Sequence, residues 1–299
     1  QATLERVGLE AGPLSQWLHA GLKAAGFPVL CIETRHLKAA LGAMRAKTDR
    51  NDARAVAQVM RVGWYRAVHV KTPEAQEQVA LVTARKLLVN KLVDMENSVR
   101  GLLRGFGLKL GVVGRVRFEA KVREMLDGAP RLLAIIEPLL IARAALKAQL
   151  AVLHRQVLQT VRHDPICRLL MTAPGVGPVV ALTFKSAVDD PARFAQSAAV
   201  GVHFGLTPKK YKSGETDRSG RITKMGDELV RTALYEAAST LMHRVQRWSW
   251  LKAWAVRVAQ RRGAKRAQVA LARKLAVVLH RMWCDGTEFR WSRAEVATA

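Results

Sequence analysis

Acidic residues are scarce in this sequence of 299 residues. It holds 24 Asp and Glu against 49 Lys and Arg, which gives a formal net charge of +25 and an isoelectric point near 11.0. This surplus exceeds what solubility requires, and its natural counter-charge is a phosphate backbone. The basic residues are spread along the chain instead of gathering on one amphipathic anchor, so nucleic acid is a better partner than a membrane surface.

Zinc-binding and membrane-spanning patterns are also missing. The three cysteines, Cys31, Cys167 and Cys284, show no C-x-x-C spacing, and no histidine pair has H-x-x-x-H spacing. Any bound metal is therefore expected to have oxygen ligands. The longest apolar run, residues 132–146, is interrupted by charges and Pro138, and it falls short of the roughly 20 residues of a membrane span. Without an apolar stretch near Glu5 and Glu10, the sequence predicts a cytoplasmic, nucleoid-associated bacterial protein.

The N-terminal part alternates strand and helix patterns. Short apolar runs at 7–10 and 28–32 predict strands, and apolar stripes within 13–22 and 36–45 predict helices. This order favours a parallel sheet, with Glu10 at the carboxyl end of its first strand, where open α/β sheets bind ligands. A glutamate at a strand end is also commonly just solvated.

Asp49 and Asp52 lie in the basic run Lys47-Thr48-Asp49-Arg50-Asn51-Asp52-Ala53-Arg54. On a helix, residues three apart share a face, so both carboxylates are able to bind one hard cation. The same pair also suits an ordinary helix start, where Thr48 or Asp49 caps and the acids face the macrodipole. The pair alone leaves both interpretations open.

Two long helical patterns follow, separated by a glycine-rich break over 101–114, and they predict an antiparallel spacer or oligomerisation arm. Next comes Pro174-Gly175-Val176-Gly177-Pro178, a pattern like a helix-hairpin-helix turn. Its Gly175 and Gly177 would let the backbone approach a nucleic-acid phosphate, although a tight helix connection fits equally. The basic helices over 257–274 have an apolar face that includes Trp250 and Trp254, which suggests packing more than base stacking.

A strongly basic segment then surrounds Ser213-Gly214. A serine hydroxyl needs a base or a metal to become a nucleophile, and a phosphodiester needs its charge neutralised before attack. Ser-Gly by itself is usually a turn. The basic residues predicted to contact nucleic acid here are Lys209, Lys210, Lys212, Arg218, Arg221 and Lys224.

Together these motifs resemble transposases of the IS110 family, in the same order and across essentially the whole chain. The match rests on Glu10 in V-G-L-E-A-G, K-T-D-R-N-D-A-R at 47–54, P-G-V-G-P at 174–178, and the glycine-bounded segment 205–226. The resemblance implies a fold of the α+β class, predominantly helical. Its parts are an N-terminally incomplete RNase H-like (RuvC-type) α/β domain over 1–70, a helical spacer over 71–163, and an all-α C-terminal domain over 164–299 with the helix-hairpin-helix-like turn.

The resemblance also implies a mechanism, in which Glu10, Asp49 and Asp52 bind Mg²⁺ and Ser213 attacks DNA. These three acids match the last three of an Asp-Glu-Asp-Asp tetrad, whose first acid would precede residue 1. The chain is thus expected to bind DNA but to recombine it poorly. The family further implies a guide RNA and a dimer or tetramer. The alternatives are a Holliday-junction-type metal-dependent nuclease and a non-catalytic DNA-binding protein.

Overall fold

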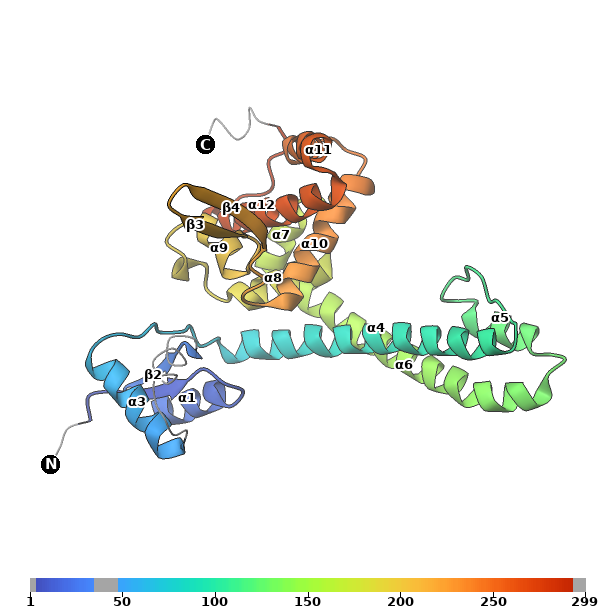
Figure 1. Cartoon of the computed structure of the whole chain (residues 1–299), viewed down its shortest axis with the longest axis horizontal. Coiled ribbons are helices and arrows are strands. Elements are labelled where there is room, and N and C mark those ends of the chain that lie inside the picture. Colours follow the sequence, from blue (N-terminus) through green and yellow to red (C-terminus); the bar gives the residue numbers. More distant parts are fainter. Residues whose placement is uncertain (1–3, 35–47, 293–299) are drawn as a thin grey trace. The chain divides into compact units, whose positions relative to one another are not determined.

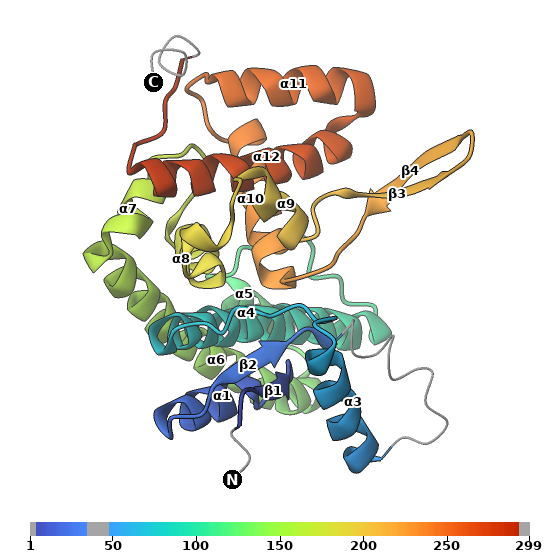
Figure 2. The ribbon, with the colours of Figure 1, turned by 90° about the vertical axis from the view of Figure 1, so that its left-hand side faces the viewer.

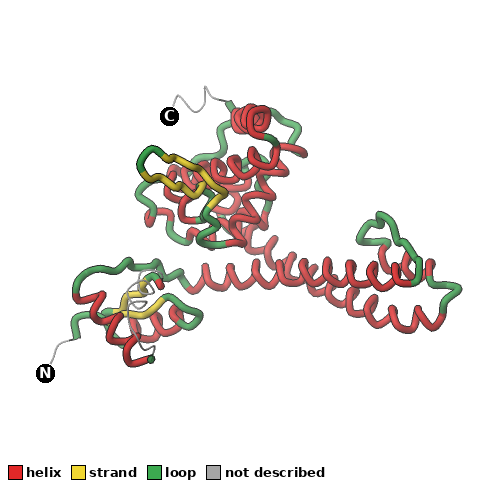
Figure 3. Tube along the Cα trace, viewed as in Figure 1, coloured by secondary structure: helices red, strands yellow, loops and turns green. Residues whose placement is uncertain are grey.

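The computed structural model describes residues 4–34 and 48–292, and it is predominantly helical (Figure 3). The chain divides into two compact units, residues 1–73 and residues 74–299, whose elements are labelled in Figure 1. The expected division of the second unit into a spacer ending at residue 163 and a C-terminal domain stays a prediction. No helix in the described ranges combines the length and the apolarity that crossing a bilayer requires.

Unit 1 is a small α/β unit around two parallel strands. Its elements are β1 (Val7–Glu10), α1 (Ser15–Ala24), β2 (Val29–Ile32) and α3 (Asp49–Arg61). The strands pair in register from Val7 opposite Val29 to Glu10 opposite Ile32. The predicted strand-helix-strand order is thereby confirmed, whereas the helix predicted over 36–45 lies outside the described residues.

Helix α3 packs directly on β1 at Gly8. A Cβ atom on Gly8 would lie 2.2 Å from Met60 Sδ and 2.8 Å from Val56 Cγ1, so a larger residue here would require both side chains to shift. Met60 continues into a small core with Ile32 and Val59. The other side of the unit is open in the described residues, because Trp17 on α1 remains 73% exposed.

Unit 2 begins with the long helices α4 (Pro73–Gly105) and α6 (Pro130–His163), with α5 (Phe118–Met125) between them. The long helices run antiparallel: Leu103 shares a buried cluster with Ile136, while Arg85 Nε lies 3.4 Å from His154 Nδ1 further along. The predicted pairing is confirmed. The predicted break at 101–114 begins too early, because the buried packing of Leu103 outweighs the low helix propensity of the glycines around it.

A buried arginine joins these three helices. The Arg143 side chain is 1% exposed, and it forms ion pairs with Glu96 of α4 and Glu119 of α5. Its Nη2 donates to the Arg115 carbonyl at 2.9 Å, and its guanidinium lies 4.6 Å from the Phe118 ring centroid. Each donor direction of the fork therefore has a partner, which is the condition for burying such a charge.

The remainder of unit 2 packs helices around one large core, with a two-stranded ribbon that projects from it (Figure 2). The predicted all-α character of this region is therefore wrong. Both ribbon strands are exposed along almost their whole length, so the alternation of apolar residues that marks a half-buried strand is missing from their sequence. The elements are α7 (Pro165–Met171), α8 (Pro178–Val188), η1 (Pro191–Arg193), α9 (Ala198–His203), β3 (Pro208–Ser213), β4 (Thr216–Ile222), α10 (Glu228–His243), α11 (Trp250–Arg262) and α12 (Ala264–Asp285).

Candidate functional site

The acid pair of unit 1 lies in the first turn of α3. Thr48 is the N-cap, because its hydroxyl accepts a hydrogen bond from the backbone N–H of Asn51 at 3.2 Å. The cap position is thus filled without either aspartate, and Asp49 and Asp52 sit one turn apart at the positive end of the helix dipole. Glu10 is the last residue of β1 and is exposed, as the sequence predicted.

These three carboxylates suit a hard divalent cation by their donor chemistry, because oxygen ligands are what Mg²⁺ prefers. Two of them share a helix turn. Within residues 4–34 and 48–292, however, no three His, Cys, Asp or Glu side chains gather in a group able to hold a metal ion. Glu10, Asp49 and Asp52 are therefore suitable ligands that the described residues do not bring into one cluster.

Ser213 lies at the tip of the β3–β4 ribbon. It pairs with Thr216 as the last rung, and Gly214 takes the positive φ of +54° that a two-residue hairpin turn needs. The serine is exposed, and in the part of the chain that the structure describes no side chain hydrogen-bonds to its hydroxyl. A nucleophilic role for Ser213 stays a prediction, and it would require a base or a metal supplied from elsewhere.

The strand register decides which cations share a face with Ser213. Tyr211 lies opposite Arg218, and residues two apart on a strand point to the same side, so this pair shares the Ser213 face. Lys212 pairs with Asp217 on the other side. Of the predicted phosphate-binding residues on the paired rungs, Arg218 is therefore the one beside the serine.

The base of the ribbon is clamped by two glycines. A Cβ on Gly205 would lie 2.1 Å from the Met225 carbonyl oxygen, and a Cβ on Gly226 would lie 2.1 Å from that of His203. Both glycines also have positive φ, +66° and +80°. They bound the 205–226 motif because the entering and leaving chains touch backbone to backbone there.

Arg231 of α10 also stabilises the base of the ribbon. Its Nη1 donates to the carbonyl oxygens of Gly226 at 2.9 Å and Met225 at 3.1 Å. The backbone adds hydrogen bonds from Thr223 N–H to Thr207 at 2.9 Å and from Lys224 N–H to Gly205 at 3.1 Å. The ribbon that carries Ser213 is therefore held at its base by side-chain and backbone hydrogen bonds together.

The Pro174–Pro178 turn connects α7 to α8, and its glycines have different surroundings. A Cβ on Gly175 would lie 2.5 Å from the Ala237 carbonyl oxygen, so close packing on α10 explains this glycine without a ligand. Gly177 is the N-cap of α8, and a Cβ there would meet open space. Gly177 keeps the access to a phosphate that the sequence suggested, and phosphate binding by either glycine stays a prediction.

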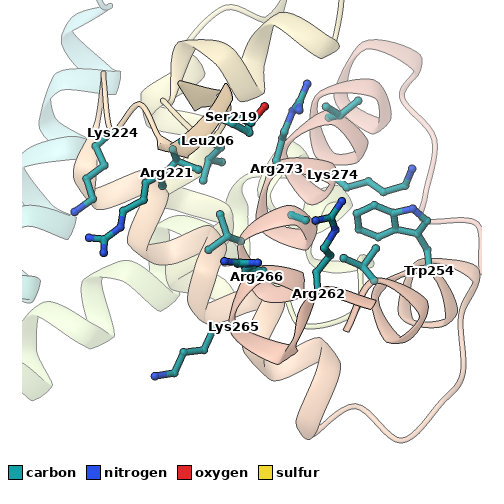
Figure 4. Close-up of a pocket in the computed structure, with 17 residues that line it drawn as sticks. Leu206, Ser219, Arg221, Lys224, Trp254, Arg262, Lys265, Arg266, Arg273 and Lys274 are labelled. Atoms are coloured by element: carbon teal, nitrogen blue, oxygen red, sulfur yellow. The ribbon is translucent and has the colours of Figure 1, made fainter. Parts of the chain in front are cut away.

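A groove lies between the base of the ribbon and helices α11 and α12 (Figure 4). Its volume is about 1180 Å³, and its wall on one side is formed by Leu206, Pro208, residues 219–222 and Lys224. Every charged residue lining it is basic, namely Arg221, Lys224, Arg262, Lys265, Arg266, Arg273 and Lys274. The run of basic residues over 257–274 predicted the positive charge of one side of this groove. Its position next to the ribbon could not be predicted from the sequence.

Comparison with known proteins defines the class as transposase. A family model described as "Transposase IS116/IS110/IS902 family" matches residues 167–255. A second model, described as a transposase and named for the DEDD transposases of IS110, matches residues 5–107. The two matches cover the acid-bearing unit and most of the region around the serine ribbon.

Two relatives agree. The transposase for insertion sequence element IS1111A of Coxiella burnetii is 30% identical over 264 residues, which covers 85% of this chain and 71% of the relative. The transposase for insertion sequence element IS1328 of Yersinia enterocolitica is 27% identical over 248 residues, covering 81% and 73%. The chain belongs to the IS110 family of transposases.

Proposed function

We propose that this transposase cuts and rejoins the DNA of an insertion sequence with Ser213 as nucleophile and with Glu10, Asp49 and Asp52 as ligands of Mg²⁺. The observation that carries the proposal is the place of Ser213, at the exposed tip of a basic ribbon that is clamped at its base. A nucleophile at the end of a projecting ribbon can reach a phosphodiester in a nucleic acid groove, since a two-stranded ribbon fits the major groove.

In the chemical step, the Ser213 oxygen attacks phosphorus and its hydroxyl proton is lost to a base. The phosphorus–oxygen bond to the leaving deoxyribose oxygen breaks, and that oxygen takes up a proton. The resulting phosphoserine conserves the bond energy, so that a hydroxyl of another DNA end can reverse the step and join to it. No outside energy source is required, in agreement with the absence of a P-loop motif in the sequence.

Arg218 is proposed to neutralise the attacked phosphate, because it shares the face of Ser213 two rungs away. The Mg²⁺ ion, when bound, would supply further positive charge at the scissile phosphate. Lys209, Lys210, Lys212, Arg221 and Lys224 are proposed to contact the backbone of nucleic acid on either side.

A guide RNA and a homo-oligomer belong to the same proposal. The net charge of +25 supports binding of more than one nucleic acid. Among the described residues, neither the ribbon nor the carboxylates form a complete catalytic site by themselves. This supports a catalytic site that is completed by bound nucleic acid or by another copy of the chain.

A covalent adduct assay tests the proposal. Labelled DNA carrying the element ends is incubated with the protein and Mg²⁺, then denatured. We expect a protein–DNA adduct that Ser213→Ala abolishes and that Ser98→Ala, an exposed serine on α4, leaves intact. Free nicked ends without an adduct would favour the metal-dependent nuclease, and intact bound DNA would favour the non-catalytic binder.

The metal ligands are tested in the same assay. We expect Asp52→Asn to abolish the adduct, whereas Asp94→Asn, an exposed aspartate on α4, leaves it unchanged. Equal loss in both variants would mean that the acids act through general charge and not as ligands.

A further inference from the structure

The groove between the ribbon and helices α11 and α12 combines a cationic rim with an apolar floor. The charged residues on its lining are all basic. Between them lie apolar side chains, among them Val258 of α11 and Val269 and Val277 of α12. A ligand that fits both the basic rim and the apolar floor must carry negative charge along its length and have apolar surfaces that pack on the floor.

We propose that this groove binds an unpaired DNA strand, with its phosphates on the rim and its bases on the floor. The inference rests on the proposed function only in taking DNA as the substrate. At about 1180 Å³ the groove exceeds the roughly 300–1,000 Å³ of small-molecule sites, which favours a polymer. A duplex keeps its base faces stacked inside and would touch the rim alone, whereas a single strand presents both phosphates and base faces.

Trp254 gives the floor an aromatic platform. It is half-buried on α11, and Lys274 Nζ of α12 lies 4.9 Å from its ring centroid. Figure 4 shows this pair at one end of the groove, with Arg221 and Lys224 of the ribbon base toward the other. An indole beside a lysine at the edge of a basic groove suits a stacked base whose phosphate is neutralised next to it.

The groove and Ser213 share the strand β4. Residues 219–222 of β4 form one wall, and Thr216 at the other end of the strand faces Ser213. Three residues of strand separate Thr216 from Ser219, roughly 10 Å. A strand held in the groove therefore lies close to the serine, so the groove is placed to hold one DNA strand apart from its partner near the point of cleavage.

Fluorescence anisotropy with short labelled oligonucleotides tests the inference. The probes are oligothymidine, the matching oligothymidine–oligoadenine duplex, and oligouridine of equal length. We expect oligothymidine to bind more tightly than the duplex. Trp254→Leu should weaken oligothymidine binding by roughly five- to 100-fold, the range for one stacked base, and leave duplex binding nearly unchanged.

Trp248→Leu is the matched control, because Trp248 is 60% exposed and does not line the groove. Should Trp254→Leu lose its helical circular dichroism, Val269→Asn tests the floor instead, with the same expected selectivity. Equal weakening by the Trp248 and floor variants, or no preference for oligothymidine over duplex, would overturn the inference. Tighter binding of oligouridine would assign the groove to RNA and overturn the assignment to DNA.

Photo-crosslinking locates the strand and separates this inference from the proposed function. Oligothymidine carrying 4-thiothymidine should crosslink to peptides within residues 254–277, and crosslinks confined to other peptides would refute the groove as its site. The measurement is made in Ser213→Ala, which cannot form the adduct. If the crosslinks do not map to the groove, the proposed role of Ser213 is unaffected. If no adduct forms with Ser213 intact, the crosslinks still test the groove.

Discussion

Gly205→Ala at the buried base of the ribbon should destabilise unit 2 more than Gly214→Ala at its exposed tip. The new Cβ would lie 2.1 Å from the Met225 carbonyl oxygen and 2.4 Å from the Met225 nitrogen, more than 1 Å inside ordinary contact. A left-handed alanine costs roughly 1–2 kcal/mol. Overpacking against a backbone that cannot yield adds about 1–3 kcal/mol, so the free energy of unfolding should fall by about 2–5 kcal/mol.

Gly214→Ala is the matched control. Its φ of +54° carries the same left-handed penalty, but its Cβ would meet nothing within 4 Å. The difference between the two variants therefore isolates the backbone clash at about 1–3 kcal/mol. Urea unfolding followed by circular dichroism measures the free energies, since helices dominate unit 2.

Hydrogen exchange locates the effect. In Gly205→Ala the exchange of the amides of Thr223 and Lys224, which donate to Thr207 and Gly205, should accelerate more than that of the helical amides of α10. Equal destabilisation by Gly205→Ala and Gly214→Ala, with unchanged exchange at Thr223, would refute the clamp at the base of the ribbon.

Three further predictions follow from named contacts. Arg218→Gln should slow adduct formation by roughly ten- to 100-fold, because a charge-assisted hydrogen bond to phosphate is lost. Lys210→Gln, on the opposite face of the ribbon, should slow it far less. Equal slowing by the two variants would contradict the strand register. Arg143→Met should lower the free energy of unfolding by about 3 kcal/mol, because Glu96 and Glu119 are partly buried and lose their partner. Arg123→Met, which breaks a surface pair with Glu137, is the control and should change it far less. Burial acts to lower the pKa of Lys185, but the hydrogen bond and charge of Asp164 outweigh it and, with Glu74, raise that pKa. Because the folded pKa lies above the unfolded one, the ion pair stabilises fully below the ordinary lysine pKa near 10.4 and is lost as pH rises above it. Urea midpoints of wild type and Lys185→Met should therefore converge only in that alkaline range, and convergence near neutral pH would contradict the assignment.

Much of the fold could be predicted from local pattern. The strands at 7–10 and 29–32 and the helix between them follow from short apolar runs broken by Pro13, Gly26 and Pro28. The antiparallel pair α4 and α6 follows from long helical periodicity around a glycine-rich stretch. The ribbon could not be predicted in this way, because its residues are exposed on both faces and carry no alternating apolar signal.

The candidate site, like the fold, could be predicted from the sequence only in part. The acid pair and Ser-Gly are ambiguous by themselves, and the roles of Asp49, Asp52 and Ser213 are predicted from the resemblance of the motifs around them to the IS110 family. The sequence does not show which basic side chain lies beside Ser213, because this depends on the register of β3 against β4. That register separates Arg218 from Lys212 by turning them to opposite faces.

The sequence by itself determined that this chain acts on nucleic acid and belongs among transposases, since charge and motif order are properties of the string of residues. Only the tertiary structure decided which residues form the groove that we propose as a binding site for a nucleic acid strand. The groove joins residues 206–224 to residues 254–277, segments that no local pattern links. Gly205 and Gly226 let the two ends of the ribbon touch backbone to backbone, and Arg231 holds them there. The helix before the ribbon, α9, packs on α12, since a Cβ on Gly201 would lie 2.9 Å from Arg273 Cγ. These contacts exist only once the chain has folded.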